Sequence, residues 1–419
     1  MDATIANSLV WGIAGLTTAG VITRPFGLPE AVWACLGAAA VVLFGLLAPG
    51  LALDAIGKGL DVYLFLFGMM LLSETARHEG LFDWVAQYAV AHAHGSPQRL
   101  FLLVYAVGVI VTAFLSNDAT AVVLTPAVFA AAKKAKLEPL PYLFICAFIA
   151  NAASFVLPIS NPANIVLYGD HTPPLAAWLK SFALPSLLSI VATYLMLRWA
   201  MRNDLDAAFT AETGTEKLSS GAKAALAGIA VTAATLLTVS LLDIRLGLPT
   251  ALLGLATTLF VLVQQRQSPL PLIKDVSWGI IPLVAGLFVL VEAIERTGLI
   301  RLLATDLTQL VAISELLAGA TAGGLVAVLS NVINNLPMGL IGATTIAAAK
   351  PPQAVTDAIL IGVDLGPNFS VSGSLATILW LLVIRREGEH VGYRTFLKIG
   401  LLVTPPALIL AIGARLLLP

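Results

Sequence analysis

The stretch FLSNDATAVVLTP, residues 114–126, places a hydroxyl, an amide and a carboxylate inside a long apolar segment. An ionisable side chain such as Asp118 is costly inside a membrane unless it faces water or a partner, and by default it marks a functional site. A second stretch, VLSNVINNLPMGL at residues 328–340, repeats the Ser-Asn dipeptide in the same kind of setting. The two stretches predict paired polar sites at membrane depth.

Composition sets the fold class. The chain has 419 residues, of which 58% are hydrophobic and 11% charged, with a mean hydropathy of +0.93. These values indicate an all-α polytopic membrane protein, because the strands of a β-barrel would alternate in hydrophobicity. The first apolar segment is predicted to be a retained span, since no basic region precedes it. A net charge of −1 argues against a nucleic-acid partner. Cys35 and Cys146 are isolated and indicate neither disulfide nor metal site.

Most apolar segments fit one helix of about 20 residues, which is the length of one crossing. Segments 100–132 and 314–349 are longer, and each is either two crossings or a re-entrant hairpin with a buried tip. The hairpin interpretation gives about ten transmembrane helices. With both termini outside, it places 16 of the 23 basic residues on the cytoplasmic side and 7 outside, as the positive-inside bias favours.

The two halves of the chain are repeats. Residues 68–82 align with residues 286–300 at an offset of 218, which pairs Glu74 with Glu292. Ser116-Asn117 is matched with Ser330-Asn331 at an offset of 214, and Asn151 with Asp364 at 213. Each half contains five crossings and one hairpin, so the second copy is inverted, as in many secondary transporters. We predict a first repeat at 1–200, a cytoplasmic linker at 201–223 and a second repeat at 224–419.

Each repeat also contains a broken helix, at 141–168 and at 356–384. Pro158 and Pro162 cannot both continue a helix, and the second segment breaks at Gly366-Pro367. Short amphipathic segments around 82–92 and 299–311 precede the hairpins and suit helices in the interface plane. Glu74 and Glu292 lie at the ends of their spans beside Arg77 and Arg296, which predicts interfacial salt bridges.

The hairpin tips and helix breaks together predict one transport site of amide and hydroxyl character. The alternative for buried amides such as Asn151, Asn334 and Asn368 is hydrogen bonding between helices. Asp118 and Asp364 are the predicted proton-coupling groups, because a low dielectric favours the neutral acid. We expect no metal site, no cofactor and no enzyme activity. The predicted substrate-binding residues are Ser116, Asn117, Asn161, Asn164, Ser330, Asn331, Asn335, Ser372 and Thr377.

This composition of the site restricts the substrate. A di- or tricarboxylate needs cationic partners, and the predicted site contains no Lys, Arg or His. A small neutral polyhydroxy solute or a cation suits amides and hydroxyls better. Three functions therefore remain open: a proton-coupled transporter of a neutral solute, a sodium/proton antiporter, and a passive channel for small neutral solutes.

Four motifs carry a family resemblance: FLSNDATAVVLTP, NAASFVLPISNPANI, VLSNVINNLPMGL and GVDLGPNFSVSGSLATILW. Together they resemble those of the arsenite and antimonite efflux permeases of the ion transporter superfamily. The resemblance implies export of arsenite or antimonite, as the neutral trihydroxide, in exchange for protons across the bacterial cytoplasmic (inner) membrane, optionally coupled to a soluble arsenite-stimulated ATPase subunit. Sodium carriers of the superfamily have Thr after Ser-Asn, whereas this chain has Asp118 and Val332, which favours proton coupling.

Overall fold

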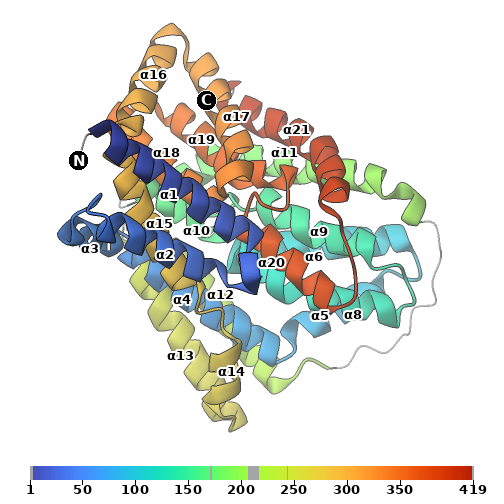
Figure 1. Cartoon of the computed structure of the whole chain (residues 1–419). Helices are drawn as coiled ribbons and strands as arrows, with labels where there is room; N and C mark the ends of the chain where they lie inside the picture. The colour runs from blue at the N-terminus through green and yellow to red at the C-terminus, as the bar shows by residue number, and fades with distance from the viewer. Residues whose placement is uncertain (1–2, 170–171, 206–216, 243, 418–419) are drawn as a thin grey trace.

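The computed structural model describes residues 3–169, 172–205, 217–242 and 244–417, and within these residues all regular structure is helical (Figure 1). The first repeat begins with two apolar helices and a short one, which are followed by a full-length helix, an amphipathic helix, a hairpin, a broken helix and a final long helix. Its elements are α1 (Ala3–Thr23), η1 (Pro25–Gly27), α2 (Glu30–Leu43), α3 (Pro49–Lys58), α4 (Leu60–His78), α5 (Leu81–His92), α6 (Pro97–Leu115), α7 (Asn117–Ala119), the π-helical η2 (Thr120–Leu124), α8 (Thr125–Lys134), α9 (Leu140–Ala152), η3 (Pro158–Ser160), α10 (Pro162–Tyr168) and α11 (Leu175–Ala200).

The second repeat has the same order of elements, which confirms the predicted architecture. A short helix, η5 (Arg202–Asp204), starts the linker, and residues 206–216 of the predicted linker lie outside the described residues. The linker is shorter than predicted, because α12 begins at Ser220. The elements are α12 (Ser220–Leu241), α13 (Gly247–Gln265), α14 (Pro269–Asp275), α15 (Ile280–Glu295), α16 (Leu299–Ile313), α17 (Glu315–Ile333), α18 (Asn335–Ala349), α19 (Gln353–Leu365), η6 (Gly366–Phe369), α20 (Leu375–Arg386) and α21 (Tyr393–Leu417).

Both long apolar segments turn back at a non-helical tip. The amphipathic helix α5 contacts both arms of the first hairpin, α6 and α8. In the second repeat α16 contacts both α17 and α18. One interfacial helix can touch both arms when they start and end at the same face of the molecule, so each segment is a hairpin. Among the described residues, eight helices are long and apolar enough to cross a membrane, and α6 and α17 are two of these eight.

The position of the second tip differs from the prediction. The first tip is Ser116, which has a φ of 121° between α6 and α7. The second tip is Asn334, which has a φ of 74° between α17 and α18. Ser330-Asn331 was matched with Ser116-Asn117 on the shared dipeptide, but both residues lie inside α17, about one turn before the tip. The structural match of Ser116-Asn117 is Asn334-Asn335, at the same offset of 218 as the preceding helices.

The two broken helices meet at their breaks. The first break separates α9 from α10, and the second separates α19 from α20. Contacts join α9 to α19 and η6, and join α10 to α19. Asn151 and Asp364 are both the penultimate residue of their half-helices, α9 and α19, as the repeat alignment predicts. The interrupted backbone of one repeat therefore lies against that of the other.

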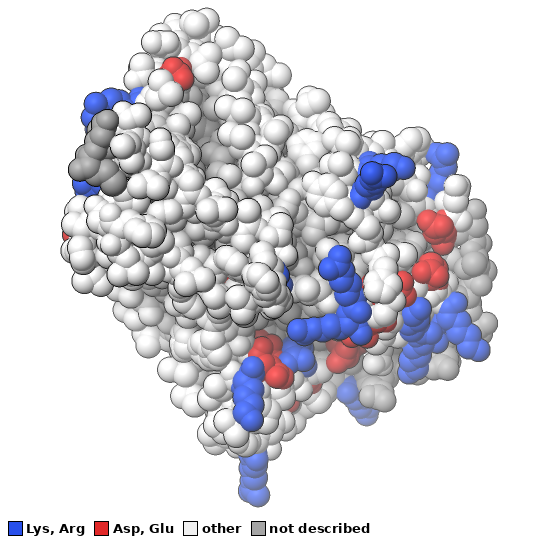
Figure 2. Space-filling model, viewed as in Figure 1, with Lys and Arg blue, Asp and Glu red and all other residues white. Residues whose placement is uncertain are grey.

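Basic side chains are unevenly distributed over the molecular surface. Figure 2 shows Lys and Arg gathered mainly toward the lower edge of the view, where α8, α14 and the end of α20 lie in Figure 1. Most of the remaining face is uncharged, as expected for a surface in contact with lipid. The lower edge is the side for which the positive-inside bias predicts a cytoplasmic position.

Two glycines bring α4 and α13 into close contact across the repeats. A Cβ atom on Gly68 would lie 2.2 Å from the carbonyl oxygen of Thr250, and one on Gly254 would lie 2.4 Å from the carbonyl oxygen of Gly68. Neither backbone atom can move without separating the helices. We expect Gly68→Ala to lower the free energy of unfolding by about 1–3 kcal/mol, measured as a lower melting temperature in detergent. Gly12→Ala is the control, because nothing lies within 4 Å of a Cβ there, and an equal loss in both variants would contradict this packing.

Candidate functional site

The closest contact between the two breaks joins Asn161 to Asp364. Asn161 caps the N-terminus of α10, where its Oδ1 accepts a hydrogen bond from the backbone N–H of Ala163 at 3.0 Å. Its Nδ2 donates to Asp364 Oδ1 at 2.8 Å. Asp364 has no exposed surface, and its Oδ2 has no hydrogen-bond partner among the described residues. An ionised carboxylate buried with an amide as partner is expensive, and a proton or a hydrogen-bond donor at Oδ2 lowers that cost.

Further amides surround this contact. Asn151 Nδ2 donates to Asn368 Oδ1 at 2.9 Å, and Asn368 Nδ2 donates to the carbonyl of Phe148 at 2.9 Å. Asn164 Nδ2 donates to the carbonyl of Ser154 at 2.9 Å, and Ser154 Oγ donates to the carbonyl of Asn151 at 2.8 Å. Asn151 and Asn368 thus form a hydrogen bond between the two repeats. This is the role in hydrogen bonding between helices that we considered as the alternative to solute binding for these amides.

Three buried acceptor oxygens in this group have no donor among the described residues. They are Asp364 Oδ2, Asn151 Oδ1 and Asn164 Oδ1. Buried polar atoms normally have partners, so each such atom needs an explanation. A solute that carries several O–H groups would supply the missing donors. The polar groups around Asp364 therefore include three buried acceptor oxygens that a donor could satisfy.

The second hairpin is hydrogen-bonded to the second break. Asn331 Nδ2 donates to the carbonyl of Gly366 at 2.9 Å, and its Oδ1 accepts from Ser370 Oγ at 2.8 Å. Ser372 Oγ donates to the carbonyl of Asn331 at 3.0 Å. Of the other predicted residues here, Asn335 donates its backbone N–H to the carbonyl of Gly373, whereas Ser330 Oγ bonds Val326 within α17 and Thr377 Oγ1 bonds Ser374 Oγ at the start of α20. The bonds of Asn331, Ser372 and Asn335 therefore join the second hairpin to the second break.

Asp118 lies in a separate cavity at the first hairpin tip. The cavity has a volume of about 50 Å³ and is bordered by α4, by the tip, by the start of α15 and by Leu379 of α20. Ser116 and Asp118 line it, as does Pro162, which follows Asn161 at the start of α10. Asn117 Oδ1 accepts a hydrogen bond from the N–H of Asp118 at 3.0 Å, which fixes the tip. The Asp118 cavity therefore adjoins α10, the helix whose N-cap residue, Asn161, donates a hydrogen bond to Asp364.

The π-helical turn η2 follows Asp118 and was not predicted. Thr120 Oγ1 bonds Thr112 Oγ1 on the opposite arm at 2.8 Å, and Thr125 Oγ1 donates to the carbonyl of Thr120 at 3.3 Å. π-Helical turns inside α-helices are frequent at functional sites. Each contains one residue more than an α-helical turn, which changes the direction of the side chains that follow. The sequence signal is weak: two threonines eight residues apart on either side of the tip.

A buried ion pair was also missed. Asp357 of α19 has no exposed surface, and its Oδ2 accepts from Arg415 Nε of α21 at 2.6 Å. Its Oδ1 accepts from Gln353 Nε2 at 2.7 Å and from the hydroxyl of Tyr168. Tyr168 ends α10, so this cluster joins the two repeats at the other end of α10 from Asn161. The prediction placed Arg415 among the seven basic residues on the outer side of the membrane and gave it no ion-pair partner.

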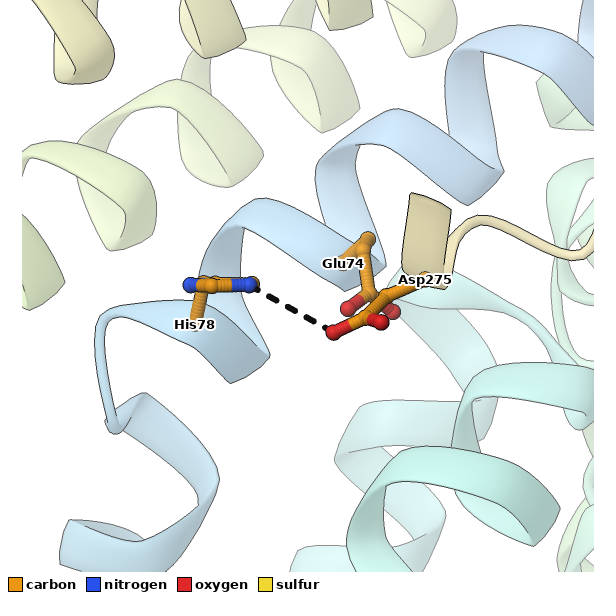
Figure 3. A group of neighbouring side chains, drawn as sticks. All are labelled: Glu74, His78 and Asp275. Atoms are coloured by element: carbon orange, nitrogen blue, oxygen red, sulfur yellow. Dashed lines mark ion pairs between the residues drawn. The ribbon is translucent and has the colours of Figure 1, made fainter. Parts of the chain in front are cut away.

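A cluster of potential metal ligands lies at the end of α4. Atoms of Glu74, His78 and Asp275 lie within 4.8 Å of one another (Figure 3). Arg77 already contacts both carboxylates: Nε donates to Glu74 Oε1 at 2.8 Å, and Nη2 donates to Asp275 Oδ2 at 2.7 Å. The guanidinium takes the place that a cation would occupy, so we interpret the group as an ion-pair cluster. The predicted salt bridges of Glu74 with Arg77 and of Glu292 with Arg296 are confirmed.

Comparison with known proteins identifies the family. The sequence model of a family described as "Citrate transporter" matches residues 18–365. The chain belongs to this citrate transporter family. Its members are membrane transporters, in agreement with the helical architecture. The YdaH transporter of Alcanivorax borkumensis, whose crystal structure is described as having an unusual topology, matches this citrate transporter family member with a TM-score of 0.58, 15% identity and 98% coverage of each chain. At that identity the likeness shows the fold alone.

Several relatives found by sequence comparison are named for arsenicals and not for citrate. The arsenical pump membrane protein of Escherichia coli K12 is 27% identical to this citrate transporter family member, with 97% of each chain covered. The arsenical pump membrane protein of Yersinia enterocolitica is also 27% identical, over 83% of each chain. A 46 kDa membrane protein of Mycobacterium leprae is 24% identical over 84% of each.

Proposed function

We propose that this transporter exports arsenite or antimonite, as the neutral trihydroxide, in exchange for protons. The observation that carries the proposal is the buried contact of Asn161 with Asp364, where three acceptor oxygens lack donors. Arsenite near neutral pH is an uncharged molecule with three O–H groups, and a buried carboxylate is the group that a proton can occupy in its place. The names of the relatives support the same substrate class.

Citrate fits this site poorly, despite the name of the family. Recognition of a tricarboxylate calls for cationic side chains or many N–H donors. The side chains that hydrogen-bond Asp364 and Asn151 in the described structure are the amides of Asn161 and Asn368, and acceptor oxygens there have no donor. A carboxylate substrate would place like charge and further acceptors against them.

We propose different roles in transport for the two carboxylates. Asp118 lines a cavity, whereas Asp364 is buried at the contact between the breaks. We propose that Asp364 exchanges its proton for the solute and that Asp118 transfers protons between the cavity and that contact. Ser116, Asn117, Asn161 and Asn164 would hold the solute, and Ser330, Asn331, Asn335, Ser372 and Thr377 would support the second hairpin and break.

The setting of the transporter is part of the proposal. We place it in the bacterial inner membrane with both termini outside, in contact with lipid on its uncharged faces. A soluble arsenite-stimulated ATPase subunit is a proposed partner on the cytoplasmic side. The proton gradient alone would drive transport when that subunit is absent. No resident cofactor is proposed.

Transport in everted membrane vesicles with an acidic lumen tests the coupling. We expect arsenite to accumulate above equilibrium, and we expect a proton ionophore to abolish the accumulation. Asp118→Asn should slow proton-driven uptake severalfold, because the first hairpin tip loses its titratable carboxyl group. If arsenite equilibrates without accumulating, the protein is a passive channel. If the vesicles move sodium in exchange for protons and leave arsenite outside, the protein is a sodium/proton antiporter.

A further inference from the structure

Two ion-pair clusters occupy matched positions in the inverted repeats. In the first, Arg77 joins Glu74 at the end of α4 to Asp275 at the end of α14. In the second, Lys58 at the end of α3 donates to Glu292 Oε2 near the end of α15 at 2.8 Å, and Arg296 Nη2 lies 3.4 Å from Glu292 Oε1. Glu74 and Glu292 are 218 residues apart, and α3 and α14 hold the same place in their repeats.

Each cluster ties one repeat to the other. Glu74 belongs to the first repeat and Asp275 to the second, whereas Glu292 belongs to the second and Lys58 to the first. The clusters lie at opposite ends of α4, because Lys58 precedes the helix and Glu74 lies near its last turn. The fourteen helical rises of 1.5 Å from Leu60 to Glu74 separate the two ends by roughly 21 Å, about two thirds of the thickness of a hydrocarbon core.

Each cluster also borders a cavity. Glu74 lines the Asp118 cavity, and Glu292 lines a larger one of about 490 Å³, which we call the α3 cavity. The two linings correspond through the repeat. Met70, Ser73, Glu74, Val122 and Ile280 of the Asp118 cavity are matched, at the offset of 218, by Phe288, Val291, Glu292, Leu340 and Val62 of the α3 cavity.

The α3 cavity reaches the second half of the first broken helix. Ile165 and Tyr168 of α10 line it, and α10 is the helix that Asn161 caps at the contact with Asp364. The Asp118 cavity touches the start of the same helix at Pro162. The Asp118 cavity therefore lies at the start of α10, and the α3 cavity lies at its other end.

We propose that the α3 cavity is the solute's access route at the face opposite the Asp118 cavity, and that each ion-pair cluster controls passage through the cavity it borders. The proposal rests on the transport function and adds the two routes and their controlling residues. The Lys58 side chain is 62% exposed and that of Glu292 is 12% exposed, so the ammonium group stays in reach of water, which weakens the pair. Such a pair can break and re-form in each cycle while the repeats move against one another.

Thiol labelling tests the two routes. In a Cys35→Ser background, which leaves the buried Cys146 as the native thiol, Val122→Cys and Leu340→Cys place one thiol in each matched cavity. We expect a membrane-impermeant maleimide to label Val122→Cys in everted vesicles and Leu340→Cys in right-side-out vesicles. Labelling of both thiols from one face would overturn the proposal.

Charge removal tests the control of each route. We expect Lys58→Ala to raise the labelling rate of Leu340→Cys severalfold and to leave that of Val122→Cys unchanged, and we expect Asp275→Asn to have the reverse effect. Lys133→Ala is the matched control, because Lys133 pairs with Glu389 at 3.1 Å away from either cavity lining. Equal rates in all three variants would overturn the assignment of the clusters. Labelling requires no arsenite transport. The experiment therefore tests the two routes independently of the identity of the substrate.

Discussion

Replacing Asp364 with asparagine is expected to reduce uphill arsenite accumulation in everted vesicles to the level of vesicles without the protein. Asparagine can still accept the hydrogen bond that Asn161 Nδ2 donates at 2.8 Å, so the contact between the breaks survives. The substituted side chain cannot gain and lose a proton, and an antiporter whose coupling group is fixed cannot exchange solute for protons. Exchange of labelled for unlabelled arsenite should persist at a reduced rate, because it needs no net proton movement but the substitution replaces the Oδ2 acceptor with an N–H donor.

A second aspartate provides the control. Asp54 lies exposed on α3, and Asp54→Asn should leave accumulation unchanged. The melting temperature in detergent should be the same for both variants and the wild type within error. Full uphill accumulation by a folded Asp364→Asn protein would remove Asp364 from the coupling mechanism. Loss of exchange together with accumulation would instead assign it to solute binding.

Much of this fold is predictable because the signals are local or repeated. Proline pairs, glycine-proline and long apolar segments mark the breaks and hairpins directly, and the five crossings and one hairpin in each half dictate the inverted relation. The amphipathic spacing of α5 and α16 is likewise a property of a short window of sequence. These features need no knowledge of which helices meet.

The error at the second tip has a physical cause. Identity of the Ser-Asn dipeptide placed the tip at Ser330-Asn331, but a helix ends where the backbone must leave the helical region. Asn334 does so with a positive φ, and its side chain accepts a hydrogen bond from the N–H of Leu336, as an N-cap. Asparagine tolerates positive φ better than most residues, and Asn-Asn-Leu-Pro has the cap and early proline of a helix start. That signal, with the constant offset of 218, identifies the tip.

Contacts between distant helices could not be predicted. Nothing in the sequence pairs Asn161 with Asp364 or Tyr168 with Asp357, because each pair joins half-helices of different repeats. The same limit explains why the ion pair of Arg415 was missed. In the sequence, an arginine near the end of the chain resembles any interfacial cation. Its partner on α19 becomes visible once α21 is packed against that helix.

The ion pair of Arg415 with Asp357 leads to the largest expected loss of stability. Asp357 has no exposed surface and the Arg415 side chain is 14% exposed, so the pair is shielded from water. Arg415→Ala would leave a buried carboxylate with Tyr168 and Gln353 as its remaining described partners. Removing one member of a buried pair costs about 3–5 kcal/mol, and we expect the melting temperature in detergent to fall accordingly.

Two further variants separate the lost charge partner from lost packing. Asp357→Asn combined with Arg415→Ala removes both charges, and it should recover part of the melting temperature because the penalty comes from the unpaired carboxylate. Lys133→Ala breaks an exposed pair with Glu389 and should cost at most about 1 kcal/mol. If the double variant is no more stable than Arg415→Ala, the arginine acts through its packing against α19. The cluster would then hold α10 in place by shape, and its charge would be incidental to the fold.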